Sequence, residues 1–322
     1  MGFIDQGDHP PLVPLTGGVS SEIYRLDLAD GPICIKRALA KLKVEQDWFA
    51  PVERSAYEVA FIRTVEGIAP GTVPRVLGYD PDALAIVMAY LDPADYPVWK
   101  DQLRDGHVDS ATATALGALL AKIHGATAGD RDVQATFDGS APVFFDLRIE
   151  SYLLATARAQ PSVAPILQNI AATTQATNLT LVHGDFSPKN ILVGPDGPVV
   201  LDSETANYGD PSFDLAFCLN HLLLKCIWKP QWTAEYLACF DALATTYLDR
   251  VTWEDSAALD ARAAALLSAF LLARIDGKSP VEYITTESDR DFVRQVAMGL
   301  LSDLPDSVTR VRQVWQDSLA GR

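Results

Sequence analysis

The sequence predicts an α+β fold of two lobes, in which an N-terminal antiparallel sheet with one helix precedes a mostly helical C-terminal lobe. Alternating apolar and polar residues within the first ninety positions indicate strands. Apolar residues at helical spacing dominate the rest of the chain. The pattern changes at Asp92-Pro93. We therefore expect an N-terminal lobe over residues 1–91 and a C-terminal lobe over residues 92–322.

Four short strands and one helix are expected in the N-terminal lobe. Two strands over residues 23–28 and 32–37 are joined by an Ala-Asp-Gly turn. Residues 52–65 place apolar side chains at helical spacing and predict the helix. Two more strands are predicted at 76–78 and 84–89, on either side of an Asp-Pro-Asp break.

Long amphipathic helices are expected beyond residue 92. Residues 109–124 place four large apolar side chains on one face of a helix. Residues 127–142 are polar and contain glycine, which predicts a surface loop.

Composition limits the classes of function. The chain has 322 residues, of which 48% are hydrophobic and 21% are charged, a balance typical of globular proteins. A net charge of −16 argues against nucleic-acid binding, which needs a basic surface. It leans weakly toward a cationic or neutral substrate. Four cysteines without a Cys-x-x-Cys pair predict buried free thiols.

We expect a cytoplasmic protein without a membrane partner. The longest apolar stretches, residues 215–228 and 266–275, are short for a membrane span and carry basic residues. The first fourteen residues lack the basic and apolar regions of a signal peptide.

The segment 181–214 carries the chemistry. His183-Gly184-Asp185 begins a loop that ends at Asn190, and an apolar strand, a Gly-Pro-Asp-Gly turn and a returning strand lead to Asp202. Such a hairpin brings Asp202 beside Asn190, where a carboxylate and an amide oxygen can share a hard cation such as Mg²⁺. Asp185 is left facing the same centre, as phosphoryl transfer requires.

This pattern resembles the catalytic and metal loops of the protein-kinase-like superfamily. The His-Gly-Asp variant and the later Gly209-Asp210-Pro211-Ser212-Phe213-Asp214-Leu215-Ala216 are similar to the aminoglycoside phosphotransferase family, with its choline kinase and methylthioribose kinase relatives. The chain has no His-Arg-Asp, Asp-Phe-Gly or Ala-Pro-Glu motif, which protein kinases carry. The resemblance thus favours a bilobal protein-kinase-like fold and the small-molecule branch.

The resemblance implies a role for each residue of this segment. Asp185 corresponds to the catalytic base or hydroxyl-orienting residue, and Asn190 and Asp202 correspond to metal ligands. Glu204 stands where methylthioribose kinases have a second acidic residue, so it either joins the metal shell or is an ordinary acidic residue after a strand. His183 and Asp214 are expected to brace the loop. We expect Lys189 to be a solvated loop lysine.

The N-terminal lobe supplies the expected nucleotide site. Ile33-Cys34-Ile35-Lys36 resembles the kinase strand whose lysine holds the α- and β-phosphates. Glu58 is the favoured helical partner of Lys36. Glu53 is the competitor, but an acidic residue in a first helical turn is explained by the helix dipole.

A loop and a hinge complete the nucleotide site. Gly17 and Gly18 allow close backbone approach to phosphates, and Ser20 and Ser21 can add hydroxyl donors. This loop resembles the Gly-Gly loop of aminoglycoside phosphotransferases, although it could be only a turn. By resemblance, the backbone groups of Ala89 and Leu91 meet adenine at the hinge. No P-loop motif occurs anywhere in the sequence.

Fewer residues point to the acceptor site. His221 and Lys225 lie one helical turn apart, either facing the cleft or on an amphipathic face. Arg274 and Asp276 lie in a segment that loosely resembles an Arg-containing segment of methylthioribose kinases, although a helix cap explains it equally well. Asp146, Arg148 and Tyr152 follow the polar loop.

The leading hypothesis is a kinase that uses ATP and Mg²⁺ to phosphorylate a hydroxyl of a sugar, amino sugar or amino alcohol. The alternative is a nucleotide-binding pseudokinase that regulates a partner protein, which predicts losses in the catalytic set. A protein kinase is disfavoured by the missing motifs. The acceptor, the choice of ATP or GTP, a metabolic or resistance role and the oligomeric state stay open.

Overall fold

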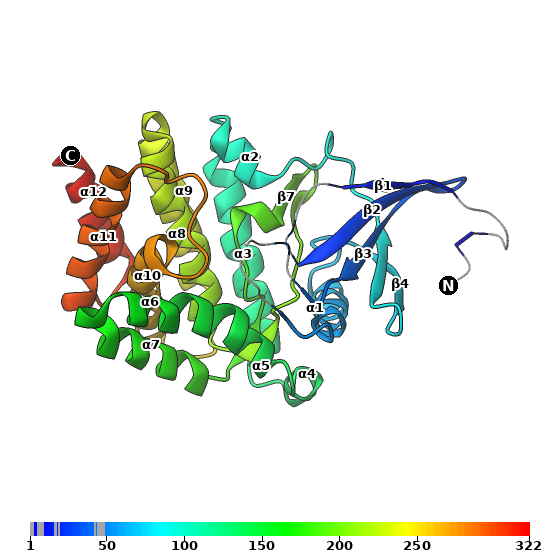
Figure 1. The fold of residues 1–322 in the computed structure, drawn as a ribbon, viewed down its shortest axis with the longest axis horizontal. Coiled ribbons are helices and arrows are strands. Elements are labelled where there is room, and N and C mark those ends of the chain that lie inside the picture. The colour runs from blue at the N-terminus through cyan, green and yellow to red at the C-terminus, as the bar shows by residue number, and fades with distance from the viewer. Residues whose placement is uncertain (1–2, 5–9, 16–17, 19, 42, 44–48) are drawn as a thin grey trace.

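The computed structural model describes residues 3–4, 10–15, 18, 20–41, 43 and 49–322. Its N-terminal part contains a five-stranded antiparallel sheet of order β1-β2-β3-β5-β4. The strands are β1 (Leu12–Pro14), β2 (Ser21–Leu28), β3 (Gly31–Ala38), β4 (Val76–Asp80) and β5 (Ala85–Ala89). β1 was not predicted; its three residues lie along one edge of the sheet. This sheet stands at one end of the molecule, and helices form the rest (Figure 1).

Helix α1 (Arg54–Ile68) packs beside this sheet (Figure 1). It begins two residues later and ends three residues later than the apolar pattern predicts. Glu58, Val59 and Ile62 are among its buried residues. β3 is central in the sheet, and Lys36 on this strand pairs with Ile23 of β2 and Ile86 of β5. A lysine in the middle strand therefore faces the helix that carries Glu58.

The C-terminal part is mostly helical, as predicted (Figure 1). Its elements are α2 (Trp99–Arg104), α3 (Ser110–Thr127), α4 (Arg131–Thr136), α5 (Ala141–Phe144), a π-helix (Phe145–Leu154), α6 (Ala155–Ala159), α7 (Ala164–Ala176), α8 (Ser212–Trp228), α9 (Thr233–Leu248), α10 (Ser256–Asp276), α11 (Glu287–Ser302) and α12 (Val308–Ala320). The predicted loop over 127–142 is wrong in part, because it contains α4. The Asp130 side chain accepts the backbone N–H groups of Asp132 and Val133 and so caps this short helix.

Two short antiparallel pairs carry the loops of interest. Strand β6 (Thr180–Val182) pairs with β9 (Asn207–Gly209), and β7 (Ile191–Gly194) pairs with β8 (Gly197–Val200). The predicted hairpin is thus confirmed. The backbone N–H of Leu201 donates to the carbonyl of Asn190 at 2.8 Å. This bond brings Asp202, the next residue, beside Asn190.

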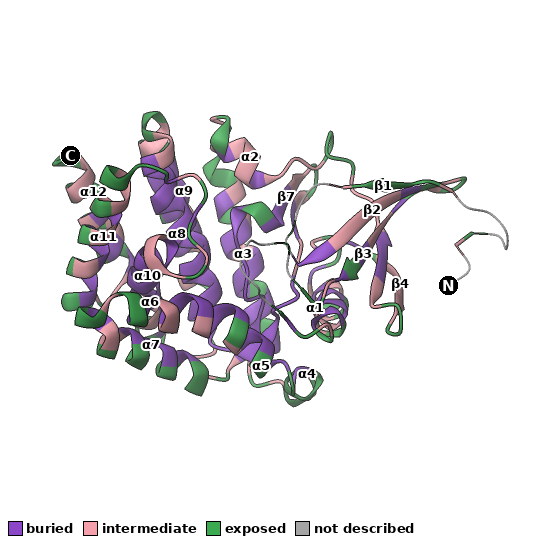
Figure 2. Cartoon of the chain, in the orientation of Figure 1, coloured by how far each residue is buried: buried purple, intermediate pink, exposed green. Residues whose placement is uncertain are grey.

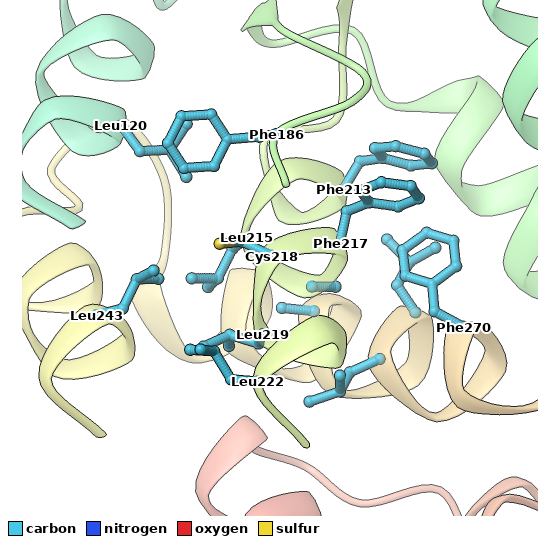
Figure 3. Packing of buried hydrophobic residues seen from close by; sticks show 14 of the residues in the cluster. Leu120, Phe186, Phe213, Leu215, Phe217, Cys218, Leu219, Leu222, Leu243 and Phe270 are labelled. Atoms are coloured by element: carbon cyan, nitrogen blue, oxygen red, sulfur yellow. The ribbon is translucent and has the colours of Figure 1, made fainter. Parts of the chain in front are cut away.

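The core of the helical part surrounds α8, which is buried along almost all of its length (Figure 2). The rings of Phe213 and Phe217 stack with centroids 5.6 Å apart, and Phe270 of α10 meets both edge-on. Figure 3 shows the three rings together. Offset and edge-to-face aromatic contacts of this kind stabilise a core beyond simple burial. They fix α8 and α10 relative to each other.

Helix α10 is the one described helix that is long and apolar enough to cross a membrane. It has 21 residues, and its most apolar 18-residue window has a mean hydropathy of 1.5, with 61% of that window buried inside the protein. The sequence analysis, which expected a shorter apolar segment at residues 266–275, therefore underestimated its length. A largely buried helix of this composition is typical of a protein core.

Candidate active site

A cavity of about 340 Å³ opens between the sheet and the β7–β8 hairpin. Ligand sites in proteins typically enclose roughly 300–1,000 Å³. Its wall includes most of the residues predicted to bind nucleotide or metal: Gly18, Ser20, Ser21, Lys36, Glu58, Ala89, Leu91, Asn190 and Asp202. Gly17, predicted with them, lies outside the described residues. The cavity therefore gathers side chains from positions far apart in the sequence.

Lys36 joins the sheet to the helical part of the molecule. Its ammonium lies 2.7 Å from a carboxylate oxygen of Glu58 and also contacts Asp202. Burial by itself would lower the pKa of Lys36, but the two carboxylates outweigh it and raise the pKa above its ordinary value. Burial raises the pKa of Glu58 to about 7, although Lys36 opposes the shift. Glu53, the competing partner, is exposed at the residue before α1.

The loop before β7 is held by Asp214 at the start of α8. Its two carboxylate oxygens accept the backbone N–H groups of His183 at 2.7 Å and Gly184 at 2.9 Å. His183 Nδ1 accepts the backbone N–H of Asp185 at 3.1 Å, so the proton on Nε2 is donated to the carbonyl of Leu201 at 3.0 Å. This is the arrangement that the expected bracing role of His183 and Asp214 requires.

Gly184 meets a constraint that only glycine satisfies easily. Its φ of +78° lies in the left-handed region. A Cβ at this position would come within 2.6 Å of the Thr205 carbonyl oxygen. The His-Gly-Asp variant of the loop therefore follows from the close approach of the chain at Thr205.

Asp185 lies between two cations. One carboxylate oxygen is 3.1 Å from the guanidinium of Arg148 and 3.0 Å from the ammonium of Lys189. Burial would raise the pKa of Asp185, but Lys189 and Arg148 outweigh it and hold the pKa below its ordinary value. Asp185 is therefore ionised at neutral pH. It can accept a hydrogen bond from a hydroxyl and orient it.

Sequence reasoning gave neither of these cations a role. Lys189 is 53% exposed, as a solvated lysine would be, but its ammonium contacts Asp185. Arg148 lies on the π-helix and also donates to the carbonyls of Gly184 and Leu147. π-helical turns are rare and concentrate at functional sites. The available signal was an arginine in the segment that follows the polar loop.

Asn190 and Asp202 fit a divalent cation. The amide nitrogen of Asn190 donates to the Asp185 carbonyl at 3.0 Å, which leaves the amide oxygen as a ligand. Asp202 has a φ of +63°, uncommon for a residue with a side chain and often found at functional sites. Within the described ranges, no group of three His, Cys, Asp or Glu side chains could hold a metal. A cation here would depend on this carboxylate, this amide and the phosphates of a bound nucleotide.

Glu204 binds Arg54 instead of standing free. Its carboxylate accepts from Arg54 Nε at 2.9 Å. The fully buried Arg54 also donates to four backbone carbonyls, including that of Ser20 at 2.6 Å. Glu204 thereby connects the segment after Asp202 to the beginning of β2. Sequence reasoning missed Arg54.

The predicted acceptor residues fall into two groups. His221, Lys225 and Arg274 are all buried, and Arg274 donates to the Tyr152 hydroxyl at 3.0 Å. Asp276 is separate, because its carboxylate is bound by Arg294 at 2.9 Å and by Gln160 at 2.6 Å. The structure shows Asp276 joining α10 to α11.

Comparisons with known proteins place this fold and site among phosphotransferases. A model of the phosphotransferase enzyme family matches residues 11–238. Methylthioribose kinases 1 and 2 of Oryza sativa subsp. japonica are each 25% identical to the chain. The aligned part is 60% of this chain in both, and 51% and 52% of the two kinases. An ethanolamine kinase of Plasmodium vivax superposes with a TM-score of 0.54 at 11% identity, over 90% of this chain and 81% of that structure.

The fold is thus that of the bilobal, protein-kinase-like small-molecule kinases, as the sequence predicts. The chain belongs to the phosphotransferase enzyme family. It spans about half the length of the two methylthioribose kinases.

Proposed function

We propose that this protein transfers the γ-phosphate of ATP to a hydroxyl group of a small molecule. The observation that carries the proposal is the contact of Lys36 with both Glu58 and Asp202. All three residues line the cavity, as does Asn190. A lysine held by a helical glutamate is the part of a kinase that binds nucleotide phosphates. The family membership supports the same reaction class.

ATP fits the cavity in size and in the nature of its wall. Met88 and Leu91 supply apolar surface for a base, and Ser20, Ser21 and Lys36 supply donors for phosphates. Asn190 and Asp202 would hold Mg²⁺, which supplies positive charge that neutralises the phosphates. We assign Glu204 to anchoring Arg54. We propose that the activity is cytoplasmic, where ATP is available.

Asp185 orients the acceptor in this proposal. Phosphoryl transfer needs the attacking hydroxyl in line with the leaving oxygen, and it needs little covalent chemistry from the protein. An ionised Asp185 accepts the hydrogen bond of the hydroxyl and takes up its proton as the bond to phosphorus forms. Arg148 and Lys189 fix this carboxylate at 3.1 and 3.0 Å. Lys36 remains on the phosphates throughout.

A pseudokinase is the competing proposal, and it predicts the loss of catalytic side chains. Lys36, Glu58, Asn190 and Asp202 are all present and line one cavity. Asp185 is also present, and its backbone carbonyl accepts from the Asn190 amide. No observation favours this alternative over the enzyme.

The test is MgATP-dependent ADP release across a panel of sugars, amino sugars, thio-sugars, amino alcohols and hydroxy acids. We expect one class to accelerate ADP release, and we expect Asp185→Ala to abolish the acceleration. ATP binding without acceleration by any acceptor would contradict the enzyme and favour the pseudokinase. Equal acceleration in Asp185→Ala would overturn the role of Asp185.

A further inference from the structure

Three basic side chains form a buried cluster in the helical part of the molecule. His221 and Lys225 of α8 and Arg274 of α10 are 7%, 1% and 8% exposed. Within the part of the chain that the structure describes, none of them has a carboxylate within ion-pair distance. Buried like charges without a counter-ion are costly. We call these three residues the basic cluster.

Aromatic rings are the nearest partners of Lys225. Its ammonium lies 4.8 Å from the ring centre of Trp228 and 5.1 Å from that of Tyr283, and the two rings stack at 4.6 Å. Cation–π contacts attract the ammonium but leave its charge uncompensated. Burial lowers the pKa of Lys225 to about 7, and Lys100 adds to the shift. Keeping the Lys225 ammonium charged at this buried position therefore lowers the free energy of unfolding.

Arg274 has an unused donor. One terminal nitrogen binds the Tyr152 hydroxyl at 3.0 Å and the Ser279 carbonyl at 2.6 Å. Its Nε, which is buried, has no hydrogen-bond partner among the described residues. A buried donor left unpaired in a folded protein calls for an explanation, and a missing ligand is one.

The basic cluster is connected to Asp185 through two side chains. The Tyr152 ring lies 6.0 Å from the guanidinium of Arg148, which is 3.1 Å from Asp185. The Phe217 ring lies 5.7 Å from the His221 ring and 5.9 Å from the same guanidinium. Phe217 belongs to the core shown in Figure 3, which holds α8 in place. The basic cluster and Asp185 are therefore neighbours in the helical part of the protein, linked by the rings of Tyr152 and Phe217.

We propose that the acceptor carries an oxyanion, a carboxylate or a phosphate group, and that His221, Lys225 and Arg274 bind this group while Asp185 orients the hydroxyl. This inference rests on the proposed function and narrows its acceptor. The oxyanion supplies the counter-ion that Lys225 lacks and the acceptor that Arg274 Nε lacks. Burial, with Arg274 and Lys225 beside it, lowers the pKa of His221, so this ring acts as a neutral hydrogen-bonding group. A cationic amino sugar or amino alcohol would be repelled by Arg274 and by the protonated form of Lys225. The weak preference for a cationic substrate suggested by the net charge is thereby reversed.

Tyr283 contacts two members of the cluster, His221 and Lys225. This residue is partly exposed, and its hydroxyl lies 3.5 Å from His221 Nδ1. It belongs to the segment between α10 and α11. Glu282 of the same segment forms its ion pair with Lys100 of α2 and not with a member of the cluster.

The test is calorimetric titration of the MgADP-saturated full chain with matched probes. D-glycerate is paired with glycerol, D-ribose 5-phosphate with D-ribose, and ethanolamine serves as the cationic probe. We expect at least one anionic probe to bind tenfold or more tighter than its neutral partner. Which pair shows the difference separates a carboxylate from a phosphate acceptor. Lys225→Met and His221→Asn should each reduce the difference tenfold.

Lys229→Met is the matched control. Lys229 also lies over Trp228, at 5.4 Å, but it is partly exposed, and its loss should leave oxyanion binding unchanged. Neutral or cationic probes binding as tightly as the anionic ones, or no anion binding at all, would overturn the inference. Failure of the chain to bind MgADP would contradict the proposed function instead. The first titration, with MgADP alone, separates these two failures.

Discussion

The guanidinium of Arg148 lies 3.1 Å from the carboxylate of Asp185, and the two residues are brought together by a π-helix and a glycine-containing loop. Arg148 also donates to the carbonyl of Gly184, so it fixes both the side chain and the backbone of this loop. Because the pair is buried, its geometry is much better defined than that of a surface ion pair. Arg148 acts as a positioning residue for Asp185.

Replacing Arg148 by Gln should lower kcat by about 10- to 100-fold, the range expected when a hydroxyl-orienting group is misplaced. Arg148 lowers the pKa of Asp185, so its loss raises this pKa, and the acidic limb of the kcat/KM profile should move to higher pH. The measurement is that profile for wild type, Arg148→Gln and Arg148→Lys. A fall in rate without movement of the limb would indicate a purely structural role.

Loss of the Lys36 ammonium should lower kcat/KM for ATP and should have a smaller effect on the stability of the fold. Lys36→Met removes the charge and hydrogen bond that lower the pKa of Glu58, so burial raises this pKa further and Glu58 takes up a proton instead of remaining as an unpaired buried charge. We expect kcat/KM for ATP to fall by about 100-fold or more, the scale of losing one charged phosphate contact. Steady-state kinetics with varied MgATP checks this. Unchanged kinetics would remove Lys36 from the nucleotide site.

Glu204 should be a stability residue. Glu204→Ala leaves Arg54 buried without its carboxylate, and breaking a buried pair typically costs roughly 3 kcal/mol of unfolding free energy. Urea denaturation measures this cost. Glu150→Ala is the control, because Glu150 pairs with Arg158 at the surface and such pairs are worth less than about 1 kcal/mol. A shift in the Mg²⁺ requirement of Glu204→Ala, without loss of stability, would make Glu204 a metal ligand instead.

Lys225 should make stability depend on pH. Burial and the positive charge of Lys100 lower its pKa from 10.5 to about 7, although Glu282, Asp101 and Cys218 oppose the shift. Between these two values the unfolded chain binds a proton that the folded chain lacks, so this group makes the unfolding free energy rise with pH. Below about pH 7 its cost is constant and largest.

Lys225→Met removes that cost, so the variant should be more stable than wild type at pH 6.5, and the difference should shrink toward pH 9.5. Urea denaturation at the two pH values, without acceptor, measures it. The partly exposed Lys229→Met serves as control and should show no such trend. A difference that stays the same at both pH values would mean that the pKa of Lys225 is not lowered.

Local signals predicted the fold and the residues that line the cavity between the sheet and the β7–β8 hairpin. The hairpin between Asn190 and Asp202 is defined by its own turn residues, and Lys36 and Glu58 lie on elements with clear periodicity. These contacts follow from short-range pattern and from family resemblance together.

The sequence did not predict which residues far apart in the chain contact each other. Arg54 meets Glu204 across 150 positions, and Arg148 meets Asp185 from a π-helix whose hydrogen bonding has no sequence signature. Asp276 was expected at the acceptor site, but Arg294 of α11 binds it, because α11 packs on α10. The basic cluster forms because α8, α10 and the segment after α10 meet in space. Hydrophobic periodicity predicts each helix but not which helices pack together.

Phosphoryl transfer by Asp185→Asn tests the central claim most directly. Asparagine keeps the shape of the side chain but cannot accept the hydroxyl proton, so we expect kcat to fall by about 100- to 10,000-fold with the acceptor that wild type uses. MgATP binding, measured in the same preparation, should stay within about threefold, because Asp185 does not line the nucleotide cavity. A rate within a few-fold of wild type would contradict the account.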